Sequence, residues 1–197
     1  MTKTRTAEVA RRTKETEIAI RLNIDGKGDS SISTGIEFFD HMLTLFAKHG
    51  LFDLEIRCQG DLGVDGHHTV EDVGIALGEA FGQALGAKEG ITRFGLAYVP
   101  MDESLCRTVV DFSGRPYLVF QAQFGAEMVG GLNTELVEEF FRALAVQSRS
   151  NLHIEVPYGK NSHHITEAIF KSAARAFCAA AELNPRVSGV PSTKGML

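Results

Sequence analysis

The sequence has 197 residues, enough for one domain of ordinary size or for two small halves packed together. Hydrophobic residues make up 44% and charged residues 23%, which is typical of a globular chain and excludes a disordered or fibrous one. The formal net charge of −5 gives no overall support for nucleic-acid binding.

Membrane and export signals are also missing from the pattern. The charged N-terminal sequence has no apolar signal core, and no run approaches the roughly 18 apolar residues that a membrane span needs. We therefore expect a cytoplasmic protein that binds neither membranes nor nucleic acids.

The first part of the chain predicts an arm, a strand, a helix, a strand and a second helix. Residues 1–16 are polar and suit an extended arm. Alternation of apolar and polar residues predicts strands at 17–25 and 51–61. Apolar residues at helical spacing predict helices at 35–50 and 70–86.

The second part repeats the order helix, strand, helix after a join near residues 88–94, with two strands before its first helix. Two strands with the turn sequence SGRP between them, a helix, a strand and a helix are predicted at 105–112, 117–124, 134–149, 151–161 and 166–183. Residues 184–197 are rich in turn formers and have no periodicity. We expect this tail, like the arm, to become ordered on ligand binding.

A repeated motif supports an internal duplication. HHTVE at 67–71 and HHITE at 163–167 share four of five letters, and each precedes a matching helix. The expected fold class is α+β: an α/β sandwich of two split βαβ units, each with the order strand, strand, helix, strand, helix and with helices on one sheet face. We expect residues 1–92 to form the first repeat with its arm, and 93–197 the second repeat with its tail, in one compact domain.

The repeated motif has the composition of a metal site. Glu71 shares a helical face with His67 and His68, and Glu167 with the second pair. Adjacent helical residues point about 100° apart, so the two histidines of one motif suit two different ions. A single HHxxE is more often an ordinary helix start, but its repetition favours metal binding.

Aligning the helices at 35–50 and 134–149 adds one residue from each to the candidate ligands. The predicted metal ligands are then His41, His67, His68, Glu71, Glu139, His163, His164 and Glu167. Shared between two ions, they leave open coordination positions for a substrate. Nitrogen and oxygen ligands without sulfur favour Mn²⁺, Fe²⁺ or Zn²⁺, and we expect two Mn²⁺ per chain.

Six motifs resemble those of the imidazoleglycerol-phosphate dehydratase family: FFDHM, GHHTVED, PMDE, SGRPY, NSHHITEAIFKSAARA and PSTKG, in this order over nearly the whole chain. The resemblance implies a lyase of histidine biosynthesis that converts imidazole glycerol phosphate to imidazole acetol phosphate. It implies a homo-oligomer of about 24 subunits with Mn²⁺ sites at subunit interfaces. It also matches the ligands above, although many members have His where this chain has Glu139.

The resemblance further implies a mechanism and roles for individual residues. Two ions clamp the substrate ring as a dimetal-bound imidazolate while hydroxide leaves. The catalytic carboxylates are Glu71, Glu167 and Glu15, the last being the base on the arm that closes over the substrate. The substrate-binding residues, including the cations of a phosphate-binding tail, are His49, Arg93, Arg115, Lys171, Ser192, Thr193 and Lys194.

The residues alone are also compatible with three other functions. A dinuclear hydrolase would use the same metals to activate water, with a bridging carboxylate that holds the ions roughly 3.5–4 Å apart. A noncatalytic metal-binding assembly protein would need neither Glu15 nor the tail. An RNA-binding module is compatible with split βαβ units, although the acidic balance opposes it.

Overall fold

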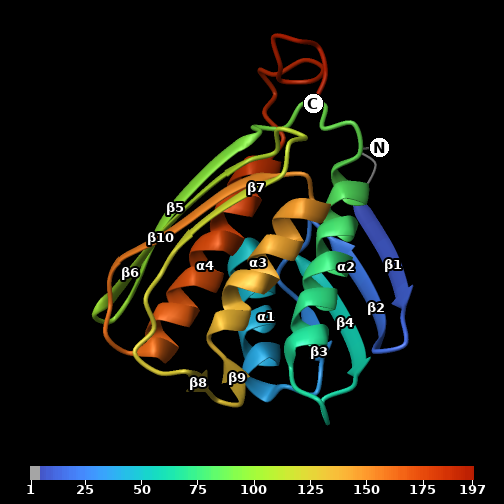
Figure 1. Ribbon diagram of the computed structural model, residues 1–197. Coiled ribbons are helices and arrows are strands. Elements are labelled where there is room, and N and C mark those ends of the chain that lie inside the picture. The colour runs from blue at the N-terminus through green and yellow to red at the C-terminus, as the bar shows by residue number, and fades with distance from the viewer. Residues whose placement is uncertain (1–4) are drawn as a thin grey trace.

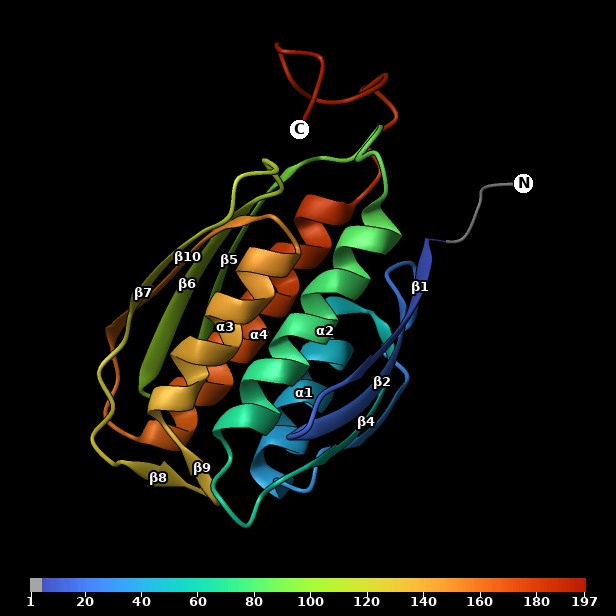
Figure 2. The same cartoon turned by 45° about the vertical axis from the view of Figure 1, so that its right-hand side comes forward.

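The computed structural model describes residues 5–197 and places two four-stranded sheets on the outside of the molecule with four helices between them (Figures 1 and 2). The first half contains β1 (Thr6–Arg12), β2 (Thr16–Asn23), β3 (Ser30–Ser33), α1 (Glu37–Gly50), β4 (Asp53–Gly60) and α2 (His67–Leu85). The second half contains β5 (Phe94–Met101), β6 (Ser104–Asp111), β7 (Tyr117–Gln121), β8 (Met128–Val129), β9 (Leu132–Asn133), α3 (Glu135–Gln147), β10 (Asn151–Tyr158) and α4 (Ser162–Ala181).

The two main sheets have the same topology. Their strand orders are β1-β2-β4-β3 and β5-β6-β10-β7. In each sheet the first two pairings are antiparallel and the last is parallel. Helices cover the inner face of each sheet (Figure 2). The predicted α/β sandwich with an internal duplication is therefore confirmed.

Part of the predicted N-terminal arm is a strand. β1 pairs with β2 along its whole length, with Val9 opposite Ile20, and it alternates buried and exposed residues. The sequence did not predict this strand, because its buried side chains are short, its exposed ones are mostly charged, and an edge strand carries little apolar signal. Glu15 consequently lies in a hairpin turn and not on a flexible arm, whereas residues 1–4 of the predicted arm lie outside the described residues.

The pattern also missed β3 and β5. β3 is short and almost entirely polar, and β5 contains a glycine and a proline, two residues that weaken a strand signal. β6 and β7 flank the SGRP turn as expected but do not pair with each other, because β10 lies between them. Each half therefore has three strands of its main sheet before its first helix, where two were predicted, and the second half adds the short pair β8 and β9.

The core lies between the helices and joins the halves. α2 packs against α3 and α1 against α4, so each of these helix pairs takes one member from each half. Phe140 stacks on Phe170, and Phe81 packs edge-on to Phe177 with ring centroids 5.2 Å apart. α2 and α3 approach closely at Gly74, where a Cβ atom would lie 2.7 Å from the carbonyl oxygen of Phe140.

The C-terminal tail leaves α4 at the upper end of Figure 1. Gly189 accepts a hydrogen bond from the Gly90 amide at 2.8 Å, and Pro191 accepts one from the Arg93 guanidinium at 2.8 Å. The tail thus lies against the loop between α2 and β5. Within residues 5–197, no helix is long and apolar enough to cross a membrane.

Candidate active site

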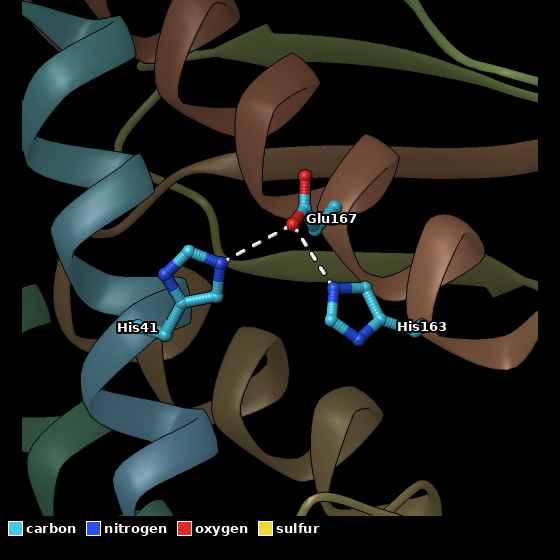
Figure 3. A group of neighbouring side chains, drawn as sticks. All are labelled: His41, His163 and Glu167. Atoms are coloured by element: carbon cyan, nitrogen blue, oxygen red, sulfur yellow. Dashed lines mark hydrogen bonds and ion pairs between the residues drawn. The ribbon is translucent and has the colours of Figure 1, made fainter.

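Helices α1 and α4 bring three predicted metal ligands together (Figure 3). Glu167 Oε1 lies 3.2 Å from His41 Nε2 and 3.1 Å from His163 Nε2. One ligand atom from each residue lies within 4.8 Å of the other two. His41 comes from the first half and the other two from the second, so the halves share this cluster, as the sequence predicted.

The carboxylate at the centre of the cluster is held as an anion. Glu167 is buried, and Lys171 Nζ donates to its Oε2 at 2.5 Å. Burial by itself raises the pKa of Glu167, but the hydrogen bonds from Lys171, His163 and His41 outweigh it and lower that pKa to about 2. At neutral pH the cluster therefore presents a carboxylate oxygen to a cation.

The helix starts orient the repeated histidines. Asn161 caps α4 and accepts a hydrogen bond from the His163 amide at 2.9 Å, while Asp65 accepts one from the His67 amide at 2.8 Å. The His163 and His164 rings are 6.1 Å apart at 84°. The rings of the first motif are 6.2 Å apart at the same angle. The prediction that the two histidines of a motif point in different directions is confirmed.

The second histidine of each motif faces carboxylates of its own half. His68 Nδ1 lies 3.0 Å from an Asp61 oxygen, and His164 Nδ1 lies 2.7 Å from a Glu103 oxygen. These hydrogen bonds raise the pKa of both imidazoles. Asp61 was not among the predicted site residues, and the sequence signal for it is only its place directly after β4. Glu103, in the PMDE motif, was expected with Asp102 from the family resemblance to support the site.

Comparisons with known proteins agree with these features. A family model described as imidazoleglycerol-phosphate dehydratase matches residues 34–177. The chain belongs to this family. The imidazoleglycerol-phosphate dehydratase of Acetivibrio thermocellus is 58% identical over 190 residues, covering 96% of this chain and 97% of the relative. That of Shouchella clausii is 56% identical over 193 residues, covering 98% of this chain and 99% of the relative.

Solved structures of the family have the same fold. The crystal structure of the Staphylococcus aureus dehydratase matches with a TM-score of 0.83 and 42% identity, covering 91% of this chain and 99% of that one. The Pyrococcus furiosus enzyme in complex with (S)-C348 matches with a TM-score of 0.83 and 38% identity, covering 96% of this chain and 100% of that one.

Five of the eight ligands expected from the imidazoleglycerol-phosphate dehydratase resemblance stand apart from the cluster: the second histidine of each motif, described above, and His67, Glu71 and Glu139. His67 Nε2 is 3.9 Å from Glu71 Oε2 on α2. Glu139 on α3 faces Arg142, whose Nε is 3.5 Å from its carboxylate. Among the described residues, the group formed by His41, His163 and Glu167 is the one that meets the spacing of a metal site. One subunit therefore does not assemble all eight expected ligands.

The predicted base and its counterpart lie in matching hairpin turns. Glu15, between β1 and β2, has an oxygen 3.9 Å from His68 Nε2. Asp102, between β5 and β6, has an oxygen 3.7 Å from His164 Nε2. Each turn carboxylate thus lies near the second histidine of the motif in its own half.

His49 and Lys171 are the substrate-binding candidates near the cluster. The pKa of His49, in the last turn of α1, is lowered by burial and then by the positive charges of Lys171 and Arg175. Lys171 is engaged with Glu167 and with Met101, whose sulfur is 3.4 Å from Nζ.

The remaining candidates gather at the other end of the subunit. Arg93 forms a two-fold ion pair with Asp111, at 2.7 and 3.1 Å, and contacts the tail that contains Ser192, Thr193 and Lys194. Arg115 is exposed beside Gly114, where a Cβ atom would lie 2.5 Å from the carbonyl carbon of Leu197. α4 has 20 residues and so spans about 30 Å between its first residue and the tail. Within one subunit these cations are therefore far from the histidine motifs.

Proposed function

We propose that this chain is a cytoplasmic, Mn²⁺-dependent hydro-lyase that converts imidazole glycerol phosphate to imidazole acetol phosphate in histidine biosynthesis. The observation that carries the proposal is the convergence of His41, His163 and Glu167 on one point in a member of this family. The proposed metal-dependent dehydration of a phosphorylated substrate needs a positioned metal, a base and a phosphate site, and the chain has candidates for each.

The donor set of the cluster suits a divalent ion of intermediate softness. Two imidazole nitrogens and one ionised carboxylate converge, with no thiolate among them. His41, His163 and Glu167 would hold one Mn²⁺, and His67, Glu71 and Glu139 would contribute to a second. Bound Mn²⁺ supplies Lewis-acid polarisation of the imidazole ring of the substrate.

In this proposal the carboxylate of Glu15 takes the proton. It is half-exposed in a fixed turn, where the Thr13 hydroxyl accepts a hydrogen bond from its amide at 3.1 Å. In the proposed reaction it takes the proton from the side-chain carbon next to the one that bears the leaving hydroxyl. The C–H and C–O bonds break, a C=C bond forms, and water leaves. The resulting enol tautomerises to the ketone.

The phosphate site requires a second copy of the chain. Arg93, Arg115 and the tail lie about one length of α4 from the histidine motifs, and an imidazole bearing a three-carbon phosphorylated chain is too short to reach both within one subunit. The outer face of β5 exposes Phe94, Leu96 and Tyr98, a surface typical of a protein contact. We therefore propose a homo-oligomer, of about 24 subunits, that joins the two ends of different copies.

Chelation and restoration of metal test this function. Protein stripped with a chelator should lose dehydration of imidazole glycerol phosphate, and added Mn²⁺ should restore it with about two ions per chain. Glu167→Gln should prevent restoration, because it removes the anionic ligand at the centre of the cluster. Product formation and metal content are measured on the same samples.

Two outcomes would redirect the assignment. Two bound ions without dehydration would support the dinuclear hydrolase or the noncatalytic assembly protein. Full activity in stripped protein, or in the Glu167→Gln variant, would contradict the metal-dependent mechanism.

A further inference from the structure

The second histidine of each motif is held through the same ring nitrogen. His68 Nδ1 contacts Asp61 and His164 Nδ1 contacts Glu103, at 3.0 and 2.7 Å. An ionised carboxylate is an acceptor only, so Nδ1 carries the proton and Nε2 of the neutral ring has the free lone pair. Neither Nε2 atom forms a hydrogen bond with any residue in the range 5–197.

The two carboxylates come from unrelated places in the repeat. Asp61 directly follows β4, whereas Glu103 lies in the turn between β5 and β6. The connection from β10 to α4 has no acidic residue, and Gly159 has no room for one. A Cβ atom there would lie 2.6 Å from Ser104 Oγ and 2.7 Å from a carbon of Ile165. Each half thus places a carboxylate on Nδ1 of its second motif histidine but takes it from a different loop. This indicates that the contact itself is needed in both halves.

The Glu103 side chain is held by more hydrogen bonds than an exposed carboxylate usually makes. Its Oε1 accepts hydrogen bonds from the backbone amides of Asn161, at 2.8 Å, and Lys160, at 3.1 Å. Its other oxygen is thereby directed at His164. The turn, the start of α4 and the imidazole are consequently linked by one side chain.

We propose that Asp61 and Glu103 are positioning residues that hold His68 and His164 with Nε2 directed outward as the metal-binding atom. A carboxylate on the non-coordinating nitrogen fixes the ring orientation and tautomer and makes the other nitrogen a stronger ligand. The inference rests on the proposed Mn²⁺ dependence, and it adds two residues that act through the histidines without touching the substrate.

Asp61→Asn is the cleanest test. The Asp61 carboxylate forms no hydrogen bond with any described residue other than His68, so the variant alters that contact alone. Mn²⁺ is titrated by calorimetry into the full-length, assembled, chelator-treated protein. We expect one class of sites to bind Mn²⁺ about 10–100-fold more weakly, with an unchanged melting temperature. Asp61→Glu, which keeps the charge, should recover part of the affinity.

Glu89→Gln is the control, because that exposed carboxylate follows the end of α2 that is far from the motif, and it forms no side-chain hydrogen bond or ion pair with any described residue. Its Mn²⁺ affinity should equal that of the unmodified protein. Glu103→Gln should weaken the other class of sites. Unmodified Mn²⁺ affinity in both Asp61→Asn and Glu103→Gln would overturn the positioning role while leaving the proposed function intact. Failure of the unmodified protein to bind Mn²⁺ would overturn both.

Discussion

Glu167 shows how a single residue prepares the cluster for a cation. A buried carboxylate is unfavourable unless hydrogen bonds replace its lost water. Lys171, His163 and His41 supply these bonds and keep it ionised. Because Lys171 occupies one carboxylate oxygen and the histidines the other, Oε1 and the two imidazoles remain together on one side. The three side chains are thus already arranged as the proposed Mn²⁺ site needs.

Glu15 is the residue whose removal should separate chemistry from binding. Glu15→Gln keeps the size and turn of the side chain but removes the base, so we expect turnover to fall by about 10²–10⁴-fold. Mn²⁺ content and substrate affinity should stay the same, because no cluster ligand changes. Steady-state kinetics and metal analysis give these values. Glu17→Gln, an exposed neighbour paired only loosely with Arg12 at 3.6 Å, is the control, and equal turnover in both variants would remove Glu15 from its role.

At the scale of elements, the spacing of α2 and α3 depends on small residues. At Gly74 a Cβ atom would lie 2.7 Å from the Phe140 carbonyl oxygen and 2.9 Å from the Ala143 Cβ. At Gly82, on the same helix, the nearest atom would be 3.4 Å away, which is an ordinary contact. The two glycines therefore differ in function: the first permits close packing, whereas the second is simply a poor helix former.

Opposite effects of alanine at these positions test this distinction. Gly74→Ala should destabilise the protein, because separating the helices costs about 1–3 kcal/mol, more than the roughly 1 kcal/mol of helix propensity that alanine adds. Gly82→Ala should raise the melting temperature by about 2–4 °C, the shift for about 1 kcal/mol at this chain length. Thermal unfolding followed by circular dichroism measures both, and a rise for Gly74→Ala would show that the helices are free to adjust.

The helices and strands also show how much of the structure could be predicted from the sequence. The helices, β4, β10 and the motifs were predictable because their apolar residues recur at regular spacing or their letters repeat. β1, β3 and β5 were not, because an edge position, polar residues or Gly and Pro suppress that spacing. In the site, His41 was found by aligning the repeats. Asp61 was not, because nothing in the sequence links it to His68. Glu103 was expected to support the site, but its contact with His164 follows from the pairing of β6 with β10, which brings the β5–β6 turn beside the start of α4.

At the scale of the whole molecule, the cluster of His41, His163 and Glu167 and the C-terminal tail lie at different ends of one subunit. If a site takes its cluster from one copy and its tail from another, two inactive variants should complement each other. Co-assembled Glu167→Gln and Lys194→Ala subunits should recover about a quarter of the unmodified activity, the random fraction of sites with both parts intact. Purified mixed assemblies, tagged on each variant, are assayed for dehydration.

The control for complementation places both changes in one cluster. Co-assembled Glu167→Gln and His163→Ala subunits should stay inactive, since every cluster then has one lesion. Absence of recovery in the first mixture, with intact assembly, would mean that tail and cluster act within the same copy.

The exchange of helices between the halves has a consequence for folding. The strong helix contacts run from α1 to α4 and from α2 to α3, across the duplication, while each single helix rests on the sheet of its own half. A half on its own would present an uncovered apolar helix layer to water, as a subunit of an obligate dimer does. The two halves of the chain therefore resemble two subunits of a dimer that are joined covalently. Separately produced halves should be insoluble alone but should reassociate when co-expressed.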